Sequence, residues 1–351
     1  MSARTQTLIG AITATLLLVA CAGPAATPTP APTAAPTVAP TTAPTATAAP
    51  VTLTLAHSYA DTQPQVVCGI KRIAEEVAAA NVGLTIEIFG SSQLGGDADR
   101  VDSVIAGDID MDIQGASALG RVYPPISAVD GAFVFDDSEH LYNYFSSAAS
   151  DPLKDGFYEA LNVTILGGWN NGGRQFTANV PIRTPEDLVG LRMRFPPTPV
   201  FLLNAAAMGA DAVEVAYEEL YLALQQGTVD GQENPLTNIK AINLPEVQDY
   251  VSLSSHQLSS NVVIIGPIWD DLNAAQQAAL QAAVNTAMTE VPVCVADAET
   301  AILDEWRTSG AIEIIDDVDR EAFRARAEPY LRGEFTPEQI EVLDAIRSLI
   351  Q

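Results

Sequence analysis

The sequence predicts an α/β fold with two lobes, each a mostly parallel sheet flanked by helices, and a long helix late in the chain. Segments with strand character alternate with helical segments from residue 52 to residue 114, and the alternation starts again at residue 163. A stretch rich in alanine and glutamine follows Asn273 and predicts the long helix. Two α/β lobes with several crossings between them suit a clamshell that closes on a ligand.

The first run of alternating elements occupies residues 52–114. Residues 52–55 alternate polar and apolar side chains, as a half-buried strand does. From residue 65 to residue 80, apolar side chains recur three or four positions apart and form one stripe of a helix. A strand at 85–89, a helix at 97–106 and a strand at 109–114 complete the run. This order implies a parallel sheet with right-handed crossovers.

The second run has strands at 163–166, 191–195, 212–215 and 262–265. Thr184 is followed by a proline and two acids, which is typical of the beginning of a helix. Further helices are expected at 199–208 and 218–226, and Gly227 ends the second of these. The apolar strand at 262–265 is expected to be buried and to cross back between the lobes.

The long helix is expected to begin after Asn273, which can cap it, and to reach toward Trp306. Pro292 falls inside this stretch. Because proline lacks an N–H donor and clashes with the preceding turn, we expect it to kink or split the helix.

The first fifty residues are expected to lie outside the folded domain, which comprises residues 51–351. Residues 1–20 have the pattern of a lipoprotein export signal, since their apolar run is too short to span a bilayer comfortably and ends directly before Cys21. An uncleaved anchor is the alternative. Residues 21–50 contain mainly Ala, Pro and Thr, and predict an extended linker. Cleavage before Cys21 would free a thiol for lipid attachment and leave the protein outside the cytoplasm, anchored to a membrane.

The chain is strongly acidic. It has 44 aspartates and glutamates against 17 lysines and arginines, a formal charge of −27. The phosphates of a nucleic acid would be repelled, so we expect no nucleic-acid partner. Each arginine is informative, because so acidic a protein needs sheltered cations if its ligand is an anion.

Besides Cys21, the chain has two cysteines, Cys68 and Cys294. An exported protein meets oxidising conditions, so these two could form a disulfide. The sequence does not show whether their Cα atoms come within bonding distance, and the pairing is left open. Neither cysteine has a histidine nearby in the sequence, so we expect no thiol nucleophile and no metal site there.

Three short blocks carry a family resemblance. They are residues 173–176 (GRQF), 190–196 (GLRMRFP) and 221–235 (YLALQQGTVDGQENP). Together they resemble the solute-binding proteins of TRAP transporters, the DctP-type family, and weaker similarity covers nearly all of residues 52–335.

The resemblance implies a type II-like periplasmic-binding-protein fold. Lobe I would comprise about 51–171 and 260–299, and lobe II about 172–259 and 300–351. The protein would capture a small organic acid outside the membrane and deliver it to the membrane subunits of a TRAP permease, which an ion gradient drives. No cofactor and no metal are expected. Members that bind sialic acid have a glutamate where this chain has Gly115, which argues against that ligand.

Arginines near strand ends are the main candidates for the site, because ligands of open α/β sheets sit there and a guanidinium matches the two oxygens of a carboxylate. The resemblance assigns Arg194 the bidentate grip on the ligand, with Arg174 and Asn234 in support. Arg192 would share a strand face with Arg194, but we expect it to be structural or solvated.

Other candidates surround these three. The resemblance suggests that Tyr217 stacks on the ligand, although ordinary packing is an equal alternative. The remaining candidates are strand-end and loop residues, namely His57, Ser58, Asp97, Gln114, Trp169 and Phe195. Packing or a structural hydrogen bond is the alternative for His57, Gln114 and Trp169, and helix capping for Asp97.

Two other functions remain open at this stage. An exported hydrolase or lyase would need a nucleophile with its base, metal ligands or a carboxylate pair. None of the three histidines stands in a known catalytic motif, but a carboxylate pair is compatible with so many acids. A receptor that senses the same ligands is the second alternative. Both are less favoured than a binding protein without enzymatic activity.

Overall fold

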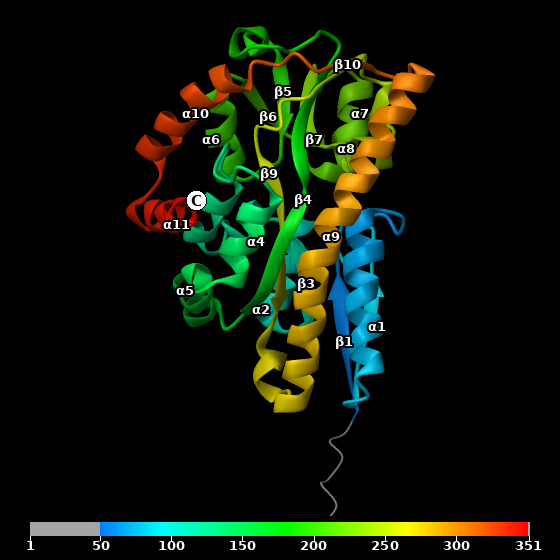
Figure 1. Cartoon of the computed structure of the whole chain (residues 1–351), viewed down its shortest axis with the longest axis vertical. Helices are drawn as coiled ribbons and strands as arrows, with labels where there is room; N and C mark the ends of the chain where they lie inside the picture. The colour runs from blue at the N-terminus through cyan, green and yellow to red at the C-terminus, as the bar shows by residue number, and fades with distance from the viewer. Residues whose placement is uncertain (1–49, 350–351) are drawn as a thin grey trace, which may run out of the picture. The chain divides into compact units, whose positions relative to one another are not determined.

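A single long strand, β4 (Thr164–Ala178), lies at the centre of the sheet. The computed structural model describes residues 50–349 and orders the strands β2-β1-β3-β9-β4-β7-β5-β6, with β8 beside β4 and β10 beside β8 (Figure 1). We call β1, β2, β3 and β9 the first strand set, and β5, β6 and β7 the second. β4 belongs to neither and joins the two.

The first strand set contains β1 (Val51–Ala56), β2 (Leu84–Phe89), β3 (Met111–Gln114) and β9 (Leu258–Ile265). β1 pairs in parallel with β2 and β3, whereas β9 runs antiparallel to both β3 and β4. The helical elements that follow in this part of the chain are η1 (Gln65–Ile70), α1 (Lys71–Ala79), α2 (Asp97–Ala106), α3 (Ala116–Leu119), η2 (Pro124–Asp130), α4 (Ser138–Ser146), η3 (Ala148–Ser150) and α5 (Asp151–Leu161). The strands and helices expected in residues 52–114 are confirmed, with small shifts at their ends.

The second strand set contains β5 (Arg192–Phe195), β6 (Asp211–Glu214) and β7 (Gly231–Pro235), and the short strands β8 (Tyr250–Ser252) and β10 (Glu313–Ile315) lie on the other side of β4. β5 is parallel to β6 and β7, and β7 is antiparallel to β4. The helical elements between these strands are η4 (Pro185–Leu188), α6 (Pro199–Met208), η5 (Tyr217–Glu219), α7 (Leu220–Gln225), α8 (Leu236–Ala241) and η6 (Leu244–Glu246), and η7 (Pro267–Asp271) follows β9 of the first set. The edge pairs β1–β2 and β5–β6 are therefore parallel. The antiparallel pairs β3–β9, β9–β4 and β4–β7 join the two sets.

The extent of β4 differs from the sequence prediction, which ended this strand at Leu166. The strand continues through four glycines, with bulges on either side of residues 167–170. A Cβ on Gly167 would lie 2.5 Å from the sulfur of Met288, and one on Gly168 would lie 2.9 Å from the ring of Phe145. These glycines let helices approach the strand closely, so they mark tight packing instead of the end of the strand.

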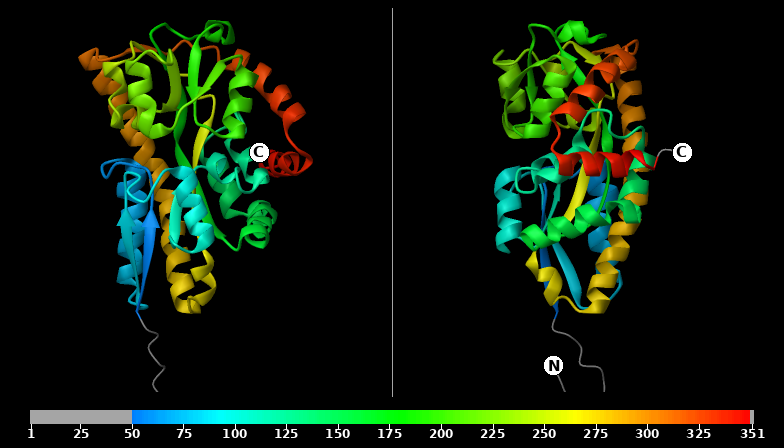
Figure 2. Two further views of the ribbon diagram at one scale, coloured as in Figure 1. Left: turned by 180° about the vertical axis from the view of Figure 1, so that it is seen from behind. Right: turned by 90° about the vertical axis from the view of Figure 1, so that its left-hand side faces the viewer.

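The long helix α9 (Ala274–Ser309) begins at Asn273 as predicted, with a capping box formed by Asn273 and Gln276. The prediction that Pro292 could split it is wrong, because the helix continues through the proline. α9 packs along β4 and also contacts α1, α8 and β10, so contacts on both sides of the proline hold the helix together. Figures 1 and 2 show it running beside elements of both strand sets.

The last two helices, α10 (Arg320–Glu334) and α11 (Pro337–Arg347), were not anticipated from the sequence. α10 packs on α6, and α11 packs on η2 and α4, so this segment contacts parts of the chain on both sides of β4. Residues 50–349 belong to one compact unit. The lobe boundaries expected from the sequence stay a prediction.

The export signal, Cys21 and most of the expected linker lie outside the described residues. Within residues 50–349, every helix is too short or too polar to be a candidate for crossing a membrane.

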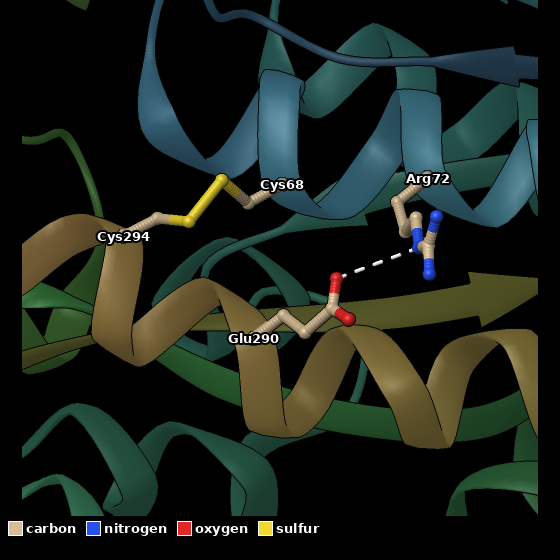
Figure 3. The surroundings of a disulfide bond; sticks show 4 residues. All are labelled: Cys68, Arg72, Glu290 and Cys294. Atoms are coloured by element: carbon tan, nitrogen blue, oxygen red, sulfur yellow. Dashed lines mark ion pairs between the residues drawn. A yellow bond between two sulfur atoms is a disulfide. The ribbon is translucent and has the colours of Figure 1, made fainter.

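The structure answers the question that the sequence left open about the two remaining cysteines. Cys68 of η1 and Cys294 of α9 form a disulfide, with their Cα atoms 6.6 Å apart and 226 positions apart in the sequence (Figure 3). Near it, Arg72 of α1 pairs with Glu290 of α9 at 3.5 Å. The disulfide therefore fastens the first helical segment to the helix that runs along β4.

We predict that the Cys68→Ser/Cys294→Ser variant folds but has a free energy of unfolding about 2–5 kcal/mol lower, because a long loop in the unfolded chain is no longer closed. Urea denaturation with and without a thiol reductant measures this. Reductant should lower the stability of the native protein and leave the double variant unchanged. Equal stability of both proteins under oxidising conditions would contradict the prediction.

Candidate functional site

A cavity of about 280 Å³ lies where the parallel strands of both sets end. Its lining includes Ser58 after β1, Gln114 at the end of β3, Arg194 near the end of β5 and Asn234 near the end of β7. Ligands of open α/β sheets occupy the crevice outside the carboxyl ends of strands, and this cavity has that position relative to both strand sets. Its volume, at the lower end for ligand pockets, fits a small molecule.

The three sequence blocks that carried the family resemblance lie on neighbouring strands. β7 pairs with β4 on one side and β5 on the other, so that Gln175 is opposite Asn234, and Arg194 is opposite Gln232. Segments up to 60 residues apart in the sequence thus bring Arg174, Arg194 and Asn234 to one cavity.

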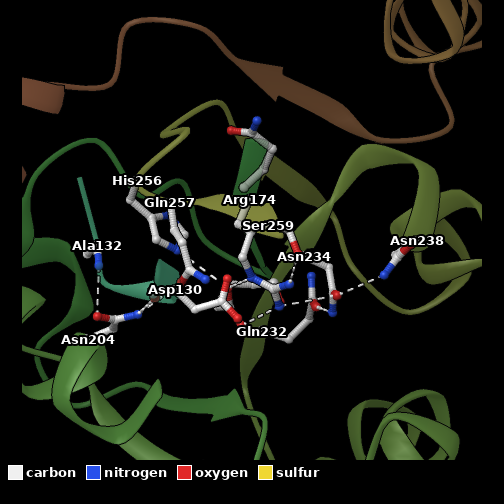
Figure 4. Close-up of polar contacts among 12 residues, drawn as sticks. Asp130, Ala132, Arg174, Asn204, Gln232, Asn234, Asn238, His256, Gln257 and Ser259 are labelled. Atoms are coloured by element: carbon white, nitrogen blue, oxygen red, sulfur yellow. Dashed lines mark hydrogen bonds and ion pairs between the residues drawn. The ribbon is translucent and has the colours of Figure 1, made fainter. Parts of the chain in front are cut away.

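Arg174 is held by a buried carboxylate. Its Nε and Nη2 donate to the two carboxylate oxygens of Glu233, and Nη2 also donates to the Glu233 carbonyl at 2.8 Å and to Asn234 Oδ1 at 3.3 Å. Its Nη1 donates to Ser259 Oγ at 3.2 Å, and the guanidinium carbon lies 4.8 Å from the centre of the Phe201 ring. Figure 4 shows Arg174 between Ser259 and Asn234. The charge of Arg174 is therefore neutralised within the protein.

Glu233 is fully buried, and its surroundings favour the charged form. Burial opposes ionisation, but the Arg174 charge and hydrogen bonds outweigh it, so the pKa of Glu233 is lowered. His256 Nε2 lies 3.5 Å from the same carboxylate, and its ring stacks on Phe176 with centroids 4.3 Å apart. Burial lowers the pKa of His256 despite Glu233, so this histidine is a neutral partner near pH 7.

Arg194 differs from Arg174 although both line the same cavity. It is only 2% exposed, and its one hydrogen bond among the described residues runs from Nε to the carbonyl of Val215 at 2.8 Å. It forms no ion pair with any carboxylate in residues 50–349. Burial lowers its pKa to about 10, with Glu233 acting in the opposite direction, so the guanidinium is still charged at neutral pH. A buried cation with both terminal nitrogens uncommitted is suited to an anionic ligand.

Two further groups in the lining have unsatisfied polar atoms. The Tyr217 hydroxyl and the side-chain oxygen of Asn171 are buried, and neither has a hydrogen-bond partner within the described part of the chain. Burial raises the pKa of Tyr217, so its hydroxyl stays protonated and can donate. Buried polar groups without partners are rare in proteins, and a ligand that fills the cavity can satisfy both.

The predicted residues Ser58, Asp97 and Gln114 also line the cavity, and Arg100 organises them. Arg100 was not identified from the sequence. It is fully buried and donates to Ser58 Oγ and Asp97 Oδ1, both at 2.9 Å, and to Asp112 at 3.2 Å. Burial raises the pKa of Asp112 to about 7, against the opposing charge of Arg100. Asp97 Oδ1 additionally accepts from Ser58 at 2.7 Å and from Gln114 at 3.3 Å, so this side of the cavity is preassembled.

Three of the residues singled out from the sequence do not line the cavity. His57, Trp169 and Phe195 are all fully buried and belong to the packed interior. A Cβ on Gly90 would lie 2.7 Å from the His57 ring, and one on Gly69 would lie 3.4 Å from the Trp169 ring. Burial lowers the pKa of His57 to about 4, with Arg100 adding to the effect. Successive side chains of a strand point to opposite faces, so a position on or beside a strand does not by itself place a side chain in the cavity. A packed or structural role was the alternative expected for His57 and Trp169, and both lie in the interior.

Sequence reasoning missed several lining residues, of which Asp130 and Phe201 bear most on the site. The buried Asp130 carboxylate accepts from the backbone N–H of Ser117 at 2.7 Å and from the Ser260 hydroxyl at 2.8 Å. It lies at the end of η2, whose composition has no helix or strand periodicity. Phe201 lies on the expected helix 199–208, but periodicity alone did not show which face it occupies.

Arg192, expected to be structural or solvated, is exposed and pairs with Asp230 at 2.6 Å outside the cavity. Residues 50–349 contain no cluster of three or more His, Cys, Asp or Glu that could hold a metal ion.

The chain is similar to known proteins over most of its length. Residues 55–338 match the family model described as bacterial extracellular solute-binding protein, family 7 (DctP). An uncharacterized protein of Sinorhizobium fredii, y4mM, is 32% identical over 83% of this chain, and the match spans 54% of that protein, about half of its length. The sialic acid-binding periplasmic protein SiaP of Vibrio cholerae is 30% identical over a match that covers 74% of this chain and 81% of the length of SiaP.

Solved structures show the same fold. A TRAP periplasmic solute-binding protein from Polaromonas, crystallised with D-erythronate, superposes with a TM-score of 0.79 and 28% identity. The superposition covers 86% of this chain and 99% of that one.

We predict that Glu233→Gln lowers the free energy of unfolding by about 3–5 kcal/mol, because it leaves the buried Arg174 charge unpaired. Urea denaturation at pH 7 measures this, with the exposed Glu214→Gln in β6 as the matched control that should change stability little.

The effect of Glu233 should also depend on pH. Because the pKa of Glu233 is lowered in the folded protein, its contribution to the free energy of unfolding is present above about pH 4.5 and is lost as the pH falls through the folded-state pKa. The difference between native protein and variant should therefore shrink in acid. A difference that is equally large at pH 3 and pH 7 would contradict this account.

Proposed function

Because the chain belongs to family 7 of the bacterial extracellular solute-binding proteins, the DctP family, we propose that it binds a small organic acid through Arg194 and passes it unchanged to the membrane subunits of a TRAP permease. Members of this family are extracytoplasmic transport proteins that bind substrates and are not enzymes.

The observation that supports this proposal most strongly is the contrast between the two arginines of the cavity. Arg174 is saturated by Glu233 and neighbouring oxygens, whereas Arg194 has one hydrogen bond and no counter-ion within the described residues. A carboxylate bound by the two terminal nitrogens of Arg194 supplies the missing negative charge. The Tyr217 hydroxyl can donate a further bond to the same group. Arg174 and Asn234 then act mainly by holding the strands beside Arg194 in place.

The receptor and exported-enzyme alternatives have less support. Asp97, Asp130 and Glu218 accept hydrogen bonds from serines, amides or Arg100, and none of the described residues that line the cavity is a histidine. Nothing in this arrangement favours a particular hydrolytic step over binding alone.

We predict that Arg194→Ala weakens binding of the acid roughly hundredfold, about 3 kcal/mol, because the buried carboxylate loses its counter-ion. Arg194→Lys should recover little, since an ammonium has no planar pair of donors. The matched control is the exposed Arg192→Ala, which should cost less than about 1 kcal/mol of binding. Calorimetric titration with the acids that raise the melting temperature in a screen measures these affinities.

The ligand-free stability of the variants separates a binding role from a structural one. Removing an unpaired buried charge should leave the melting temperature of Arg194→Ala unchanged or raise it. Near-normal binding by Arg194→Ala, or equal losses for Arg192→Ala and Arg194→Ala, would remove the carboxylate contact from Arg194. A screen in which only neutral sugars or amines bind would refute the function itself.

Lipid anchoring at Cys21 is a separate part of the proposal, based on the sequence before that residue. We predict that Cys21→Ser abolishes metabolic labelling with a radioactive fatty acid and releases the protein from the membrane fraction. Persistent labelling of the Cys21→Ser variant would contradict this assignment.

A further inference from the structure

The cavity is asymmetric in charge, and this asymmetry restricts the ligand further than the Arg194 contact does. Three arginines line it. Arg174 is neutralised by Glu233, and Arg121, which is partly exposed, pairs with Asp102 at 2.5 Å and donates to the Ala98 carbonyl. Within the described residues, only Arg194 is left as a lining cation without a carboxylate partner.

The lining contains four carboxylates, which we call the acidic wall: Asp97, Asp99, Asp130 and Glu218. In the described part of the chain, Arg100 is the one cation paired with any of them, through Asp97, and it also pairs with the buried Asp112. Asp130 is satisfied by serine and backbone donors, which carry no charge. Arg194 is thus the one lining cation in the described residues that can pair with a ligand carboxylate, and a second ligand carboxylate would meet the acidic wall without a counter-ion.

The acidic wall and its neighbours are also rich in uncommitted acceptors. In residues 50–349, Asp97 Oδ2, Glu218 Oε2 and both carboxylate oxygens of Asp99 accept no hydrogen bond from the protein. The side-chain oxygen of Asn171, which is 1% exposed, also lacks a partner there. Acceptors of this kind are satisfied by hydroxyl groups, whereas a carboxylate offers them nothing and adds repulsion.

We infer that the ligand is a hydroxylated monocarboxylate of about four to six carbons, and that the acidic wall discriminates against dicarboxylates of the same length. This inference rests on the proposed function, since it takes the first carboxylate to bind Arg194. The hydroxyl groups of the ligand donate to the wall and to Asn171. The cavity volume of about 280 Å³ sets the upper limit on length.

The solvent exposure of the acidic wall sets how strongly it can discriminate between monocarboxylates and dicarboxylates. The Asp97 side chain is 47% exposed, so solvent screens part of its repulsion. We therefore expect discrimination of at least tenfold in Kd rather than several thousandfold. A site whose polar groups are left without partners also rejects a ligand that lacks the matching donors, so an unhydroxylated acid such as butyrate should bind weakly too.

Pairs of acids that share a carbon skeleton test the inference. Threonate and gluconate have one carboxylate, and tartrate and glucarate are the same skeletons with a second carboxylate in place of the terminal alcohol. Calorimetric titration of the purified protein should give at least tenfold tighter binding for the better of the two monocarboxylates than for its dicarboxylate partner. Equal or tighter binding of the dicarboxylates would overturn the inference and leave the proposed function standing. Failure of all four acids to bind, while an acid without hydroxyl groups binds, would overturn the inference alone. Failure of every organic acid in the broader screen would refute both.

A pair of variants tests whether the acidic wall causes the discrimination. Asp99→Asn/Glu218→Gln removes two wall charges, neither of which forms an ion pair within the described residues. We expect it to tighten dicarboxylate binding at least threefold and to narrow the ratio between the paired acids. The matched control, Asp317→Asn/Glu321→Gln, makes the same change in charge at positions 66% and 84% exposed outside the cavity, and should leave the ratio unchanged. The same ratio in the wall variant and the native protein would remove this role from the wall.

Discussion

The bidentate ion pair between Arg174 and Glu233 is the interaction on which the site depends. It crosses from β4 to β7 in the buried middle of the sheet, and it neutralises one of the two buried guanidinium groups of the cavity. Because Glu233 is committed to Arg174, Arg194 on the next strand has no counter-ion within the described residues. Arg174 on β4 is therefore neutralised within the protein, and Arg194 on β5, with β7 between them, is the cation that we propose for the ligand.

Several features keep Arg194 in place. Its Nε is fixed by the Val215 carbonyl, which directs the two terminal nitrogens away from that contact. β4 carries the ion pair and joins the two strand sets, while α9 packs along β4 and is fastened to η1 through the Cys68–Cys294 disulfide. The cavity is lined by residues of both strand sets, and β4 and α9 connect these two sets. This arrangement suits a binding site whose walls come from different parts of the chain.

Much of this arrangement was predictable from the sequence, and the limits have physical causes. Periodicity located the parallel strands and most of the helices, and the three sequence blocks identified the arginines and Asn234 before their proximity was known. β7 was missed as a strand because its core sequence, residues 231–235, is polar and ends in proline. Its buried polar groups are satisfied by cross-strand partners, among them Thr177 and Arg174, and no local pattern shows this. His57 directly follows β1 and Phe195 ends β5, as expected, whereas Trp169 lies within β4 and not at its end. The face of a strand on which a side chain lies depends on packing partners far along the chain.

A crystal structure of the protein with a bound hydroxylated monocarboxylate tests the central claim most directly. We expect both carboxylate oxygens of the ligand to lie within hydrogen-bond distance of the terminal nitrogens of Arg194, while Arg174 remains bidentate to Glu233. A ligand carboxylate that displaces Glu233 from Arg174, or that lies against the acidic wall with Arg194 facing a hydroxyl group, would contradict the account.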